Sequence, residues 1–483
     1  MRPTNDSPSS GSPSPTPRSA DPFIATGIFI ALAALYGSTS LGRYESYDGE
    51  MMFRVAENLI ERGTIRITDE IFHASEPYSV FGLGTSLAFA PSLVVGKALG
   101  LDPRFLAALT NAWVTAATGS LAYAFGRLLA DSHRRGVALA ILFGAGTIAW
   151  PYAKSVFSEP LIGLLIGLTT YCLIRHRQDD TRPRRWLIIA GLALGYAVLT
   201  REDTAATVPI FLLYVVHGAW FGRSGAAAGD AVRVRLRDAG IDAGLFLGCL
   251  APFLVAALTY HALRFGSLLS GFLDRTGNTF LLDPAAVAIG VFGLTLSSGK
   301  GLVFFSPLSI GGIAALPAFA RSHRAEAVLI AAIVVERILL FGSFSRWFGG
   351  WGWGPRYLVP LGLLLLLPIV TLPARRWRHG LPILALAVAG LVVQIAGVAV
   401  LYVDYLTAAL DERDLAWSQL FYAPFASPIV GHIEFLLAGR DIGFLVPLPD
   451  TPTMFIARWA VAAIGVVALA TAIERARRLD RMR

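Results

Sequence analysis

Residues Leu381–Val400 read LPILALAVAGLVVQIAGVAV, an apolar run that contains a single amide side chain and no charged residue. A helix of about 20 residues, rising about 1.5 Å per residue, spans the roughly 30 Å hydrocarbon core of a bilayer. The run lacks the apolar–polar alternation of a membrane barrel strand. Because backbone groups in lipid must bond internally, the run predicts a transmembrane α-helix.

The whole chain has the same character. Hydrophobic residues make up 55% of its 483 residues and charged residues only 15%, whereas soluble domains carry about 25% charged residues. The net charge of +8 comes from Arg clusters between apolar runs, which is the positive-inside pattern rather than a basic patch for nucleic acid. Cys172 and Cys249 both fall inside apolar runs, so we expect neither a disulfide framework nor a thiolate metal site. The composition predicts an all-α polytopic membrane protein.

The basic clusters set the expected topology. Placing every cluster in the cytoplasm gives about 12 transmembrane helices, in a range of roughly 11–13, with both chain ends in the cytoplasm. This count requires that segment 81–99 does not cross, since otherwise Arg134 and Arg135 would lie outside. Pro91 and several glycines interrupt that segment, which fits an interfacial or re-entrant helix. The same reasoning makes Pro284–Leu296 interfacial.

These assignments divide the chain into membrane modules, loops and tails. The expected segments are a disordered cytoplasmic N-terminus (1–21), an N-terminal transmembrane module (22–221) with outer loop 42–80 and interfacial helix 81–99, a basic cytoplasmic loop (222–240), a C-terminal transmembrane region (241–473) with outer loops 262–300, 344–355 and 403–453, and a basic cytoplasmic tail (474–483).

The first outer loop carries Tyr47-Asp48-Gly49-Glu50 ahead of a helical pattern that ends near Gly63. Asp48 sits where an N-cap is expected and Glu50 falls in the first turn, where the helix dipole favours carboxylates. A structural cap is therefore one interpretation. The other is chemical, because a carboxylate beside the membrane surface can take a proton from an acceptor hydroxyl or hold a divalent cation.

The second outer loop, residues 150–160, contains Lys154 and Glu159. An ammonium and a carboxylate in one short loop can bind a phosphate and a metal respectively. The structural alternatives are that Lys154 snorkels to the interface and that Glu159 only starts a helix. Arg201, beside Glu202 and Asp203, ends another outward-running span.

Two further outer stretches carry basic residues. Ser297-Ser298-Gly299-Lys300-Gly301 resembles an anion-binding nest but lacks the full pattern of a nucleotide P-loop. In residues 346–357, glycines alternate with tryptophans, which suggests a close-packed loop that presents Arg346 and Arg356 to a phosphate. Glu336–Arg337 lies inside the preceding span, where such charges mark either function or a mutually neutralising pair.

These stretches resemble the GT-C superfamily of membrane glycosyltransferases, in particular its protein mannosyltransferase and aminoarabinose-transferase-like branches. Ser46–Gly63 resembles the acidic motif and juxtamembrane helix of their first outer loop. Glu76-Pro77-Tyr78 with Gly82-Leu83-Gly84 resembles their outer-side helix, and Ser158-Glu159-Pro160 the acidic site of the second loop. The likeness covers roughly the first 220 residues, so it implies that the transmembrane module 22–221 is a GT-C-like catalytic module.

The resemblance implies a glycosyltransferase that moves a sugar, with inversion, from a polyprenyl-phosphate-linked donor to an envelope glycan, lipid or protein. The reaction is expected at the outer face of a bacterial cytoplasmic membrane. Asp48, as general base, and Glu50 are the implied catalytic residues, and Glu159 contacts the acceptor or a metal. The only cofactor that the resemblance suggests is a divalent metal ion, Mg²⁺ or Mn²⁺. The implied ligands of the donor phosphate are Lys154, Arg201, Lys300 and Arg356.

A transporter or flippase of a lipid-linked or polar solute is the main alternative, and a non-catalytic scaffold is the second. A transporter predicts polar residues along several spans and charged pairs near the midplane. The centres of most spans here are apolar, with Glu336–Arg337 as the main exception, so the sequence favours the enzyme.

Overall fold

The computed structural model describes residues 20–40, 46–67, 77–179, 183–221, 231–268, 278–373, 377–440 and 452–482. These residues form helices, and their only β pairings are two isolated bridges, between Arg66 and Tyr78 and between Phe280 and Phe344. The predicted all-α fold is confirmed. Outside the described residues lie most of the predicted disordered N-terminus (1–21), residues 222–230 of the basic loop, and parts of the outer loops 42–80, 262–300 and 403–453.

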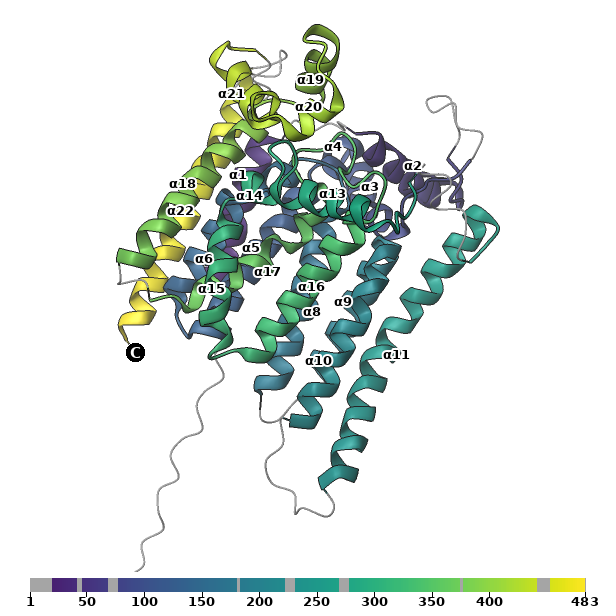
Figure 1. Cartoon of the computed structure of the whole chain (residues 1–483), viewed down its shortest axis with the longest axis vertical. Helices are drawn as coiled ribbons and strands as arrows, with labels where there is room; N and C mark the ends of the chain where they lie inside the picture. Colours follow the sequence, from purple (N-terminus) through teal and green to yellow (C-terminus); the bar gives the residue numbers. More distant parts are fainter. Residues whose placement is uncertain are drawn as a thin grey trace, which may run out of the picture.

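The first and last described helices are antiparallel neighbours that mark the two ends of a helical bundle (Figure 1). At the end that lies lower in Figure 1, which we call the lower end, Asp21 precedes α1 (Pro22–Thr39) and accepts a hydrogen bond from Arg475 of α22 (Pro452–Arg481) at 2.8 Å. At the opposite end, which we call the upper end, the carbonyl oxygen of Ser40 accepts one from Arg458 at 3.1 Å. These two contacts fix the terminal helices to each other at both ends.

Most other long helical segments run between these two ends. They are α5 (Thr110–Ala130), α6 (His133–Gly146), α8 (Glu159–Gln178), α9 (Arg185–Thr200), α10 (Val208–Phe221), α11 (Ala231–Phe265), α15 (Leu308–Ala320), α16 (Arg324–Gly342), the consecutive η2 (Arg356–Leu361), α17 (Gly362–Leu366) and η3 (Leu367–Thr371), and α18 (Trp377–Ala399). Among the described residues, 5 helices are long and apolar enough to cross a membrane, and several apolar helices are shorter. The expected total of about 12 crossings stays a prediction.

Short elements gather at the upper end, where the site lies. They are α2 (Tyr47–Arg62), α3 (Leu83–Leu99), α4 (Pro103–Ala108), α7 (Ala149–Ala153), η1 (Glu202–Thr207), α13 (Pro284–Leu296), α14 (Leu302–Phe305), α19 (Tyr402–Thr407), η4 (Ala408–Glu412), α20 (Trp417–Tyr422), η5 (Pro424–Ala426) and α21 (Pro428–Leu437). Figure 1 places α2 and α3 beside the upper ends of α9 and α11, and α19 to α21 above α18.

Helix α3 corresponds to the segment predicted not to cross. It has 17 residues with Pro91 inside, and it begins against the end of α9. The Tyr196 hydroxyl donates to the carbonyl oxygen of Gly84 at 2.7 Å, and a Cβ atom on Gly84 would lie 2.7 Å from the Cα atom of Thr200. Only glycine permits this approach. The N-terminal end of α3 is therefore fixed to the upper end of α9, although its path relative to a membrane stays a prediction.

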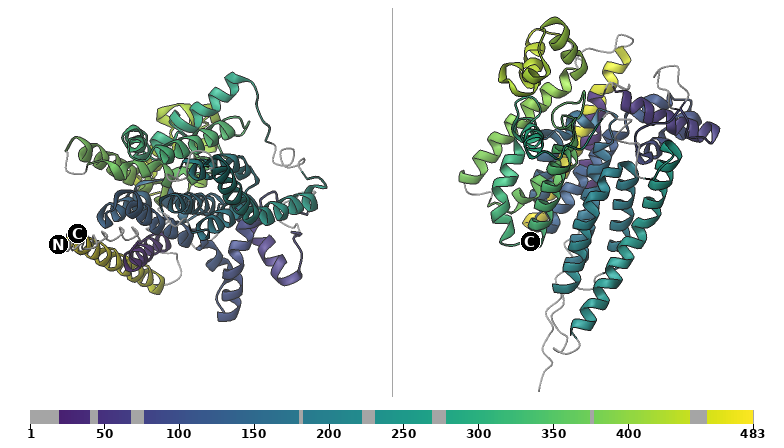
Figure 2. Two further views of the ribbon diagram at one scale, coloured as in Figure 1. Left: turned by 90° about the horizontal axis from the view of Figure 1, so that it is seen from below. Right: turned by 45° about the vertical axis from the view of Figure 1, so that its right-hand side comes forward.

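Basic residues mark the lower end. Arg134 lies in the first turn of α6, where the Asp480 carboxylate accepts hydrogen bonds from the backbone N–H groups of His133 and Arg134 at 2.9 and 3.0 Å. Arg233 and Arg235 lie near the start of α11, which reaches furthest down the bundle together with α10 (Figure 2). Arg134, Arg233 and Arg235, which the sequence assigns to the cytoplasm, thus lie at the end opposite the predicted site residues.

Candidate active site

The start of α2 positions the acidic motif. Ser46, and not Asp48 as predicted, is the N-cap, because its side-chain oxygen accepts from the backbone N–H of Gly49 at 3.2 Å. Asp48 follows in the first turn, so its carboxylate is not used for capping. Instead, Asp48 Oδ2 lies 2.5 Å from an Nη2 atom of Arg356.

Arg356 joins two of the predicted acidic residues. Its Nε atom donates to Glu159 Oε1 at 2.7 Å, while its Nη2 atom pairs with Asp48. Glu159 is 1% exposed and also accepts from Arg201 Nη1 at 2.8 Å. One buried carboxylate therefore holds two guanidinium groups side by side. These four residues come from α2, α8, the end of α9 and η2.

The ion pairs continue away from Arg201 toward α16. Arg201 Nε donates to Asp203 Oδ2, and Arg337 Nη1 donates to Asp203 Oδ1, both at 2.8 Å. Arg337 is 2% exposed, donates to the Thr207 hydroxyl at 2.6 Å, and has its Nε atom 3.3 Å from Glu336 Oε2. Asp203 and Arg337 were not among the predicted site residues. Their signal was present, however, in Arg201-Glu202-Asp203 and in the adjacent charges Glu336 and Arg337 of α16.

A cavity of about 700 Å³ opens onto this row of charges. We call it the charged cavity. Acidic and basic side chains both line it, together with Tyr47, Asn278, Tyr357 and backbone of residues 346–357, which we call the glycine-rich loop. Its charged lining residues are Asp48, Arg201, Glu202, Asp203, Arg346 and Arg356.

Glu202 fixes the rim of the charged cavity to α11. It forms an ion pair with Arg264, whose Nη1 atom also donates to the carbonyl oxygens of Ser79 and Phe81 at 3.2 and 3.0 Å. His261 Nδ1 lies 3.5 Å from the same carboxylate. The segment before α3 is thus tied to the cavity wall.

Glu50 points elsewhere. Its carboxylate accepts from Arg54 Nε at 2.8 Å and from Arg104 Nη1 at 2.9 Å, and Glu50 is not among the residues that line the charged cavity. The guanidinium group of Arg104 also lies 4.9 Å from the centre of the Phe53 ring. In this arrangement Glu50 links α2 to α4 and has no place beside Asp48.

Lys154 and Lys300 also lie at the upper end, but outside the charged cavity. Lys154 lines a second cavity of about 330 Å³ and donates to the carbonyl oxygen of Val398 at 2.8 Å. Lys300 is fully buried and donates to the carbonyl oxygens of Gly352 and Gly350 at 2.5 and 3.2 Å. Burial, and secondarily the charge of Arg356, lowers the pKa of Lys300 to about 7. Lys300 therefore braces the glycine-rich loop.

The acidic residues do not fit a divalent metal in this arrangement. The positive charge between Asp48 and Glu159 is the guanidinium group of Arg356, which would repel a cation placed there. In the part of the chain that the structure describes, no group of three or more His, Cys, Asp or Glu side chains could hold a metal ion.

Residues 93–230 match the family model of dolichyl-phosphate-mannose-protein mannosyltransferases. The predicted GT-C resemblance is confirmed. The matched segment contains Lys154, Glu159, Arg201 and Asp203, and the match indicates a membrane glycosyltransferase rather than a transporter. No curated protein matches the sequence.

Solved structures of two enzymes are also similar to this chain. ArnT from Cupriavidus metallidurans has 14% sequence identity and a TM-score of 0.49, over 93% of this chain and 74% of that one. ArnT bound to undecaprenyl phosphate has 16% identity and a TM-score of 0.48, over 94% and 77%. The Archaeoglobus fulgidus oligosaccharyltransferase, in complex with zinc and sulfate, has 16% identity and a TM-score of 0.44, over 77% and 53%.

Proposed function

We propose that this protein transfers a sugar from a polyprenyl-phosphate-linked donor to an acceptor hydroxyl, and that the reaction takes place in the charged cavity. The observation that carries the proposal is the shared lining of this cavity by Asp48, Arg201 and Arg356. A carboxylate suits proton removal, and two adjacent guanidinium groups suit a phosphate. The match to a mannosyltransferase family model supports the same chemistry.

The proposed step is a direct displacement. The acceptor oxygen forms a bond to the anomeric carbon while the bond from that carbon to the phosphate oxygen breaks. Asp48 receives the acceptor proton, and the polyprenyl phosphate leaves with the bonding electron pair and its charge facing Arg201 and Arg356. Attack opposite the leaving group inverts the anomeric centre. Preorganised cations that face a developing charge commonly contribute the largest part of such catalysis.

Because Arg356 pairs with Asp48, binding of the donor phosphate would also affect the proposed base. Before the donor binds, Arg356 is shared between Asp48 and Glu159. A donor phosphate that attracts this guanidinium group weakens its pairing with Asp48, which makes that carboxylate a better proton acceptor. Donor binding therefore prepares the base. Lys154 and Lys300, outside this cavity, are proposed to support its surroundings rather than to contact the phosphate.

We propose that the charged cavity faces the outer side of a bacterial cytoplasmic membrane and that both chain ends are cytoplasmic. The support is the position of Arg134, Arg233 and Arg235 at the lower end, opposite Asp48, because short cytoplasmic loops collect basic residues. An envelope glycan, lipid or protein then supplies the acceptor hydroxyl.

The test is the variant Asp48→Asn, which keeps the shape but removes the proton acceptor. The protein in nanodiscs, mixed with solubilised membranes as the acceptor source, is given radiolabelled polyprenyl-phosphate mannose or polyprenyl-phosphate glucose. We expect release of polyprenyl phosphate to fall about 10²- to 10⁴-fold, the usual contribution of general-base catalysis. Glu50→Gln, from the same helix, is the control and should retain turnover. Unchanged turnover by folded Asp48→Asn protein, or an equal loss in Glu50→Gln, contradicts the assignment.

A further inference from the structure

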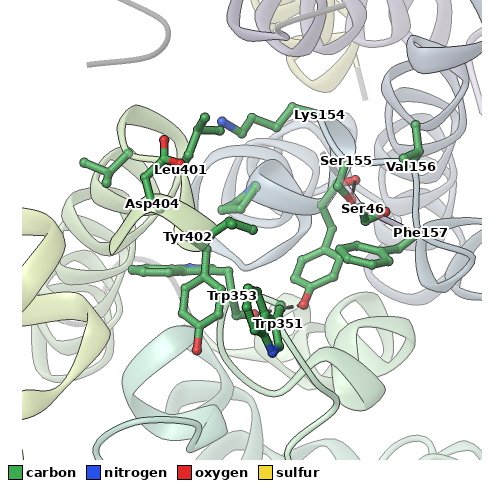
Figure 3. Close-up of a pocket in the computed structure, with 16 residues that line it drawn as sticks. Ser46, Lys154, Ser155, Val156, Phe157, Trp351, Trp353, Leu401, Tyr402 and Asp404 are labelled. Atoms are coloured by element: carbon green, nitrogen blue, oxygen red, sulfur yellow. Dashed lines mark hydrogen bonds between the residues drawn. The ribbon is translucent and has the colours of Figure 1, made fainter. Parts of the chain in front are cut away.

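A second cavity lies beside the charged cavity and has a different lining. It has a volume of about 330 Å³, and we call it the aromatic cavity because rings from separate parts of the chain surround it (Figure 3). Tyr152 comes from α7, Trp351 and Trp353 come from the glycine-rich loop, and Tyr402 begins α19. Lys154 and Asp404 add charged groups to this lining.

The ring of Trp353 is a fixed wall. It is 4% exposed and packs edge-on against Phe305, with ring centroids 4.9 Å apart. Its carbonyl oxygen accepts from the Tyr152 hydroxyl at 3.0 Å. A Cβ atom on Gly397 of α18 would lie 2.5 Å from this indole. Glycine at this position therefore allows α18 to pack closely against the ring. The position of the Trp353 ring is therefore fixed by the protein in the absence of a ligand.

The indole N–H group of Trp353 is a buried hydrogen-bond donor. Trp353 Nε1 is buried, lies against Gly397, which also lines the cavity, and finds no hydrogen-bond acceptor among the described residues. Buried donors are nearly always paired in folded proteins. This N–H is enclosed by the protein, with Gly397 of α18 against it, so the indole presents an apolar ring surface to the aromatic cavity and not a donor.

Trp351 and two charged side chains complete a mixed lining. Trp351 is 53% exposed although it lines the cavity, so much of its ring surface is accessible to a ligand. In Figure 3, the Lys154 side chain extends across the rim toward the side that carries Asp404. Groups of opposite charge at one rim provide both donors and acceptors for hydroxyl groups.

The two cavities share a partition. Ser46, the N-cap of α2, lines the aromatic cavity, whereas Asp48, two residues later, lines the charged cavity. Phe157 lines the aromatic cavity, and the guanidinium group of Arg356 lies 3.9 Å from the centre of its ring. A molecule in the aromatic cavity would therefore lie across this partition from the proposed base and the proposed phosphate ligand, and an acceptor held there must extend past the partition to react in the charged cavity.

We infer that the aromatic cavity is a saccharide-binding subsite that holds the acceptor, so that the acceptor of this enzyme is a glycan. The inference rests on the proposed function for the direction of transfer. The C–H groups on one face of a pyranose ring carry partial positive charge and match the negative faces of aromatic rings, and its hydroxyls match the charged groups of Lys154 and Asp404 at the rim. A lipid chain would use none of these polar groups, and pockets of roughly 300 Å³ suit small ring compounds.

The test measures saccharide binding directly. Methyl glycosides of mannose, glucose, galactose and N-acetylglucosamine are mixed with the protein in nanodiscs, without alkyl glycoside detergent, and saturation-transfer NMR detects those that bind. We expect at least one glycoside to give a signal with the wild-type protein and Trp351→Ala to abolish it. The matched control is Trp113→Ala, since Trp113 is 51% exposed but lies on α5 in a different, apolar cavity.

The possible outcomes separate this inference from the proposed function. Asp48→Asn should bind glycosides like the wild type, since Asp48 does not line the aromatic cavity. Loss of donor turnover together with retained glycoside binding in this variant supports both proposals. Donor turnover in the wild type without any glycoside signal, a signal that survives in folded Trp351→Ala protein, or Trp351-dependent binding of octanol but of no glycoside would overturn the inference. Glycoside binding without donor turnover would instead contradict the proposed function alone.

Discussion

At the scale of single residues, Glu159 has the most consequential position. It does not line the charged cavity, yet its Oε1 atom accepts from both Arg201 and Arg356. Two guanidinium groups repel each other, and a buried carboxylate between them offsets that repulsion. We therefore propose that Glu159 positions the two arginines; the acceptor or metal role that the resemblance implies stays a prediction.

Glu159→Gln should lower the stability strongly and weaken donor binding. Breaking a buried ion pair commonly costs about 3–5 kcal/mol, and Glu159 is 1% exposed. Glu50→Gln should cost less than Glu159→Gln, because Glu50 is 16% exposed and its partner Arg104 has a side chain that is 41% exposed. Thermal unfolding in nanodiscs and the KM for the donor check both expectations. An unchanged melting temperature with abolished turnover would instead give Glu159 a direct part in the chemistry.

Lys300 should make the stability depend on pH. Its pKa is lowered by burial from 10.5 to about 7 in the folded protein, so between these values the unfolded state binds more protons than the folded state. Stability therefore rises with pH across this window and is flat below it. The melting temperature of the wild type relative to Lys300→Met should increase from pH 7 toward pH 10. A constant difference would show that the ammonium group is not held in this buried site.

At the scale of elements, the contact between α3 and α9 connects the predicted non-crossing helix with the site. Gly84 lies at the start of α3, and Thr200 precedes Arg201 and itself lines the charged cavity. Displacing α3 therefore moves the segment that carries a proposed phosphate ligand.

Gly84→Ala should reduce both the melting temperature and the affinity for the donor. The added Cβ atom would lie 2.2 Å from Thr200 Oγ1 and 2.7 Å from its Cα atom, so the two helices must separate. Gly37→Ala is the matched control in α1, where a Cβ atom meets nothing within 4 Å and alanine is the better helix former by roughly 1 kcal/mol. Equal behaviour of the two variants would contradict the close packing of α3 on α9.

At the scale of the whole molecule, the expected topology can be tested by cysteine labelling. After Cys172 and Cys249 are replaced, single cysteines are introduced at exposed sites: Ser418→Cys at the upper end, Ser322→Cys at the lower end, and Ala98→Cys near the end of α3. A membrane-impermeant maleimide applied to intact cells should label Ser418→Cys and Ala98→Cys but not Ser322→Cys. Labelling of Ala98→Cys only after permeabilisation would mean that α3 crosses the membrane.

The features that could be predicted from the sequence are local ones. Apolar run length and Arg clustering predict helices and group Asp48, Lys154, Arg201 and Arg356 at one end, because neither property depends on how the chain packs. The partners of these groups could not be predicted, because they depend on tertiary contacts. Lys154 donates to a carbonyl oxygen 244 residues away, and Arg337 pairs with Asp203 across 134 residues.

These contacts cross the boundary between the predicted N-terminal catalytic module and the predicted C-terminal region. Asp48, Glu159 and Arg201 belong to segment 22–221, whereas Arg337 and Arg356 belong to segment 241–473. One row of ion pairs therefore draws on both segments. We expect neither segment to form the charged cavity alone.

This row of ion pairs also imposes an order on biosynthesis. Asp48 and Glu159 are translated early, and Arg201 with Asp203 follows soon after, so Glu159 can pair with Arg201 in the nascent chain. Arg337 and Arg356 emerge much later, and among the described residues Arg356 is the one that connects Asp48 to the rest. A ribosome-bound intermediate that ends before residue 356 thus has its N-terminal helices but not its donor site. If the charged cavity binds the donor phosphate as proposed, this site forms late in synthesis, after much of the chain has entered the membrane.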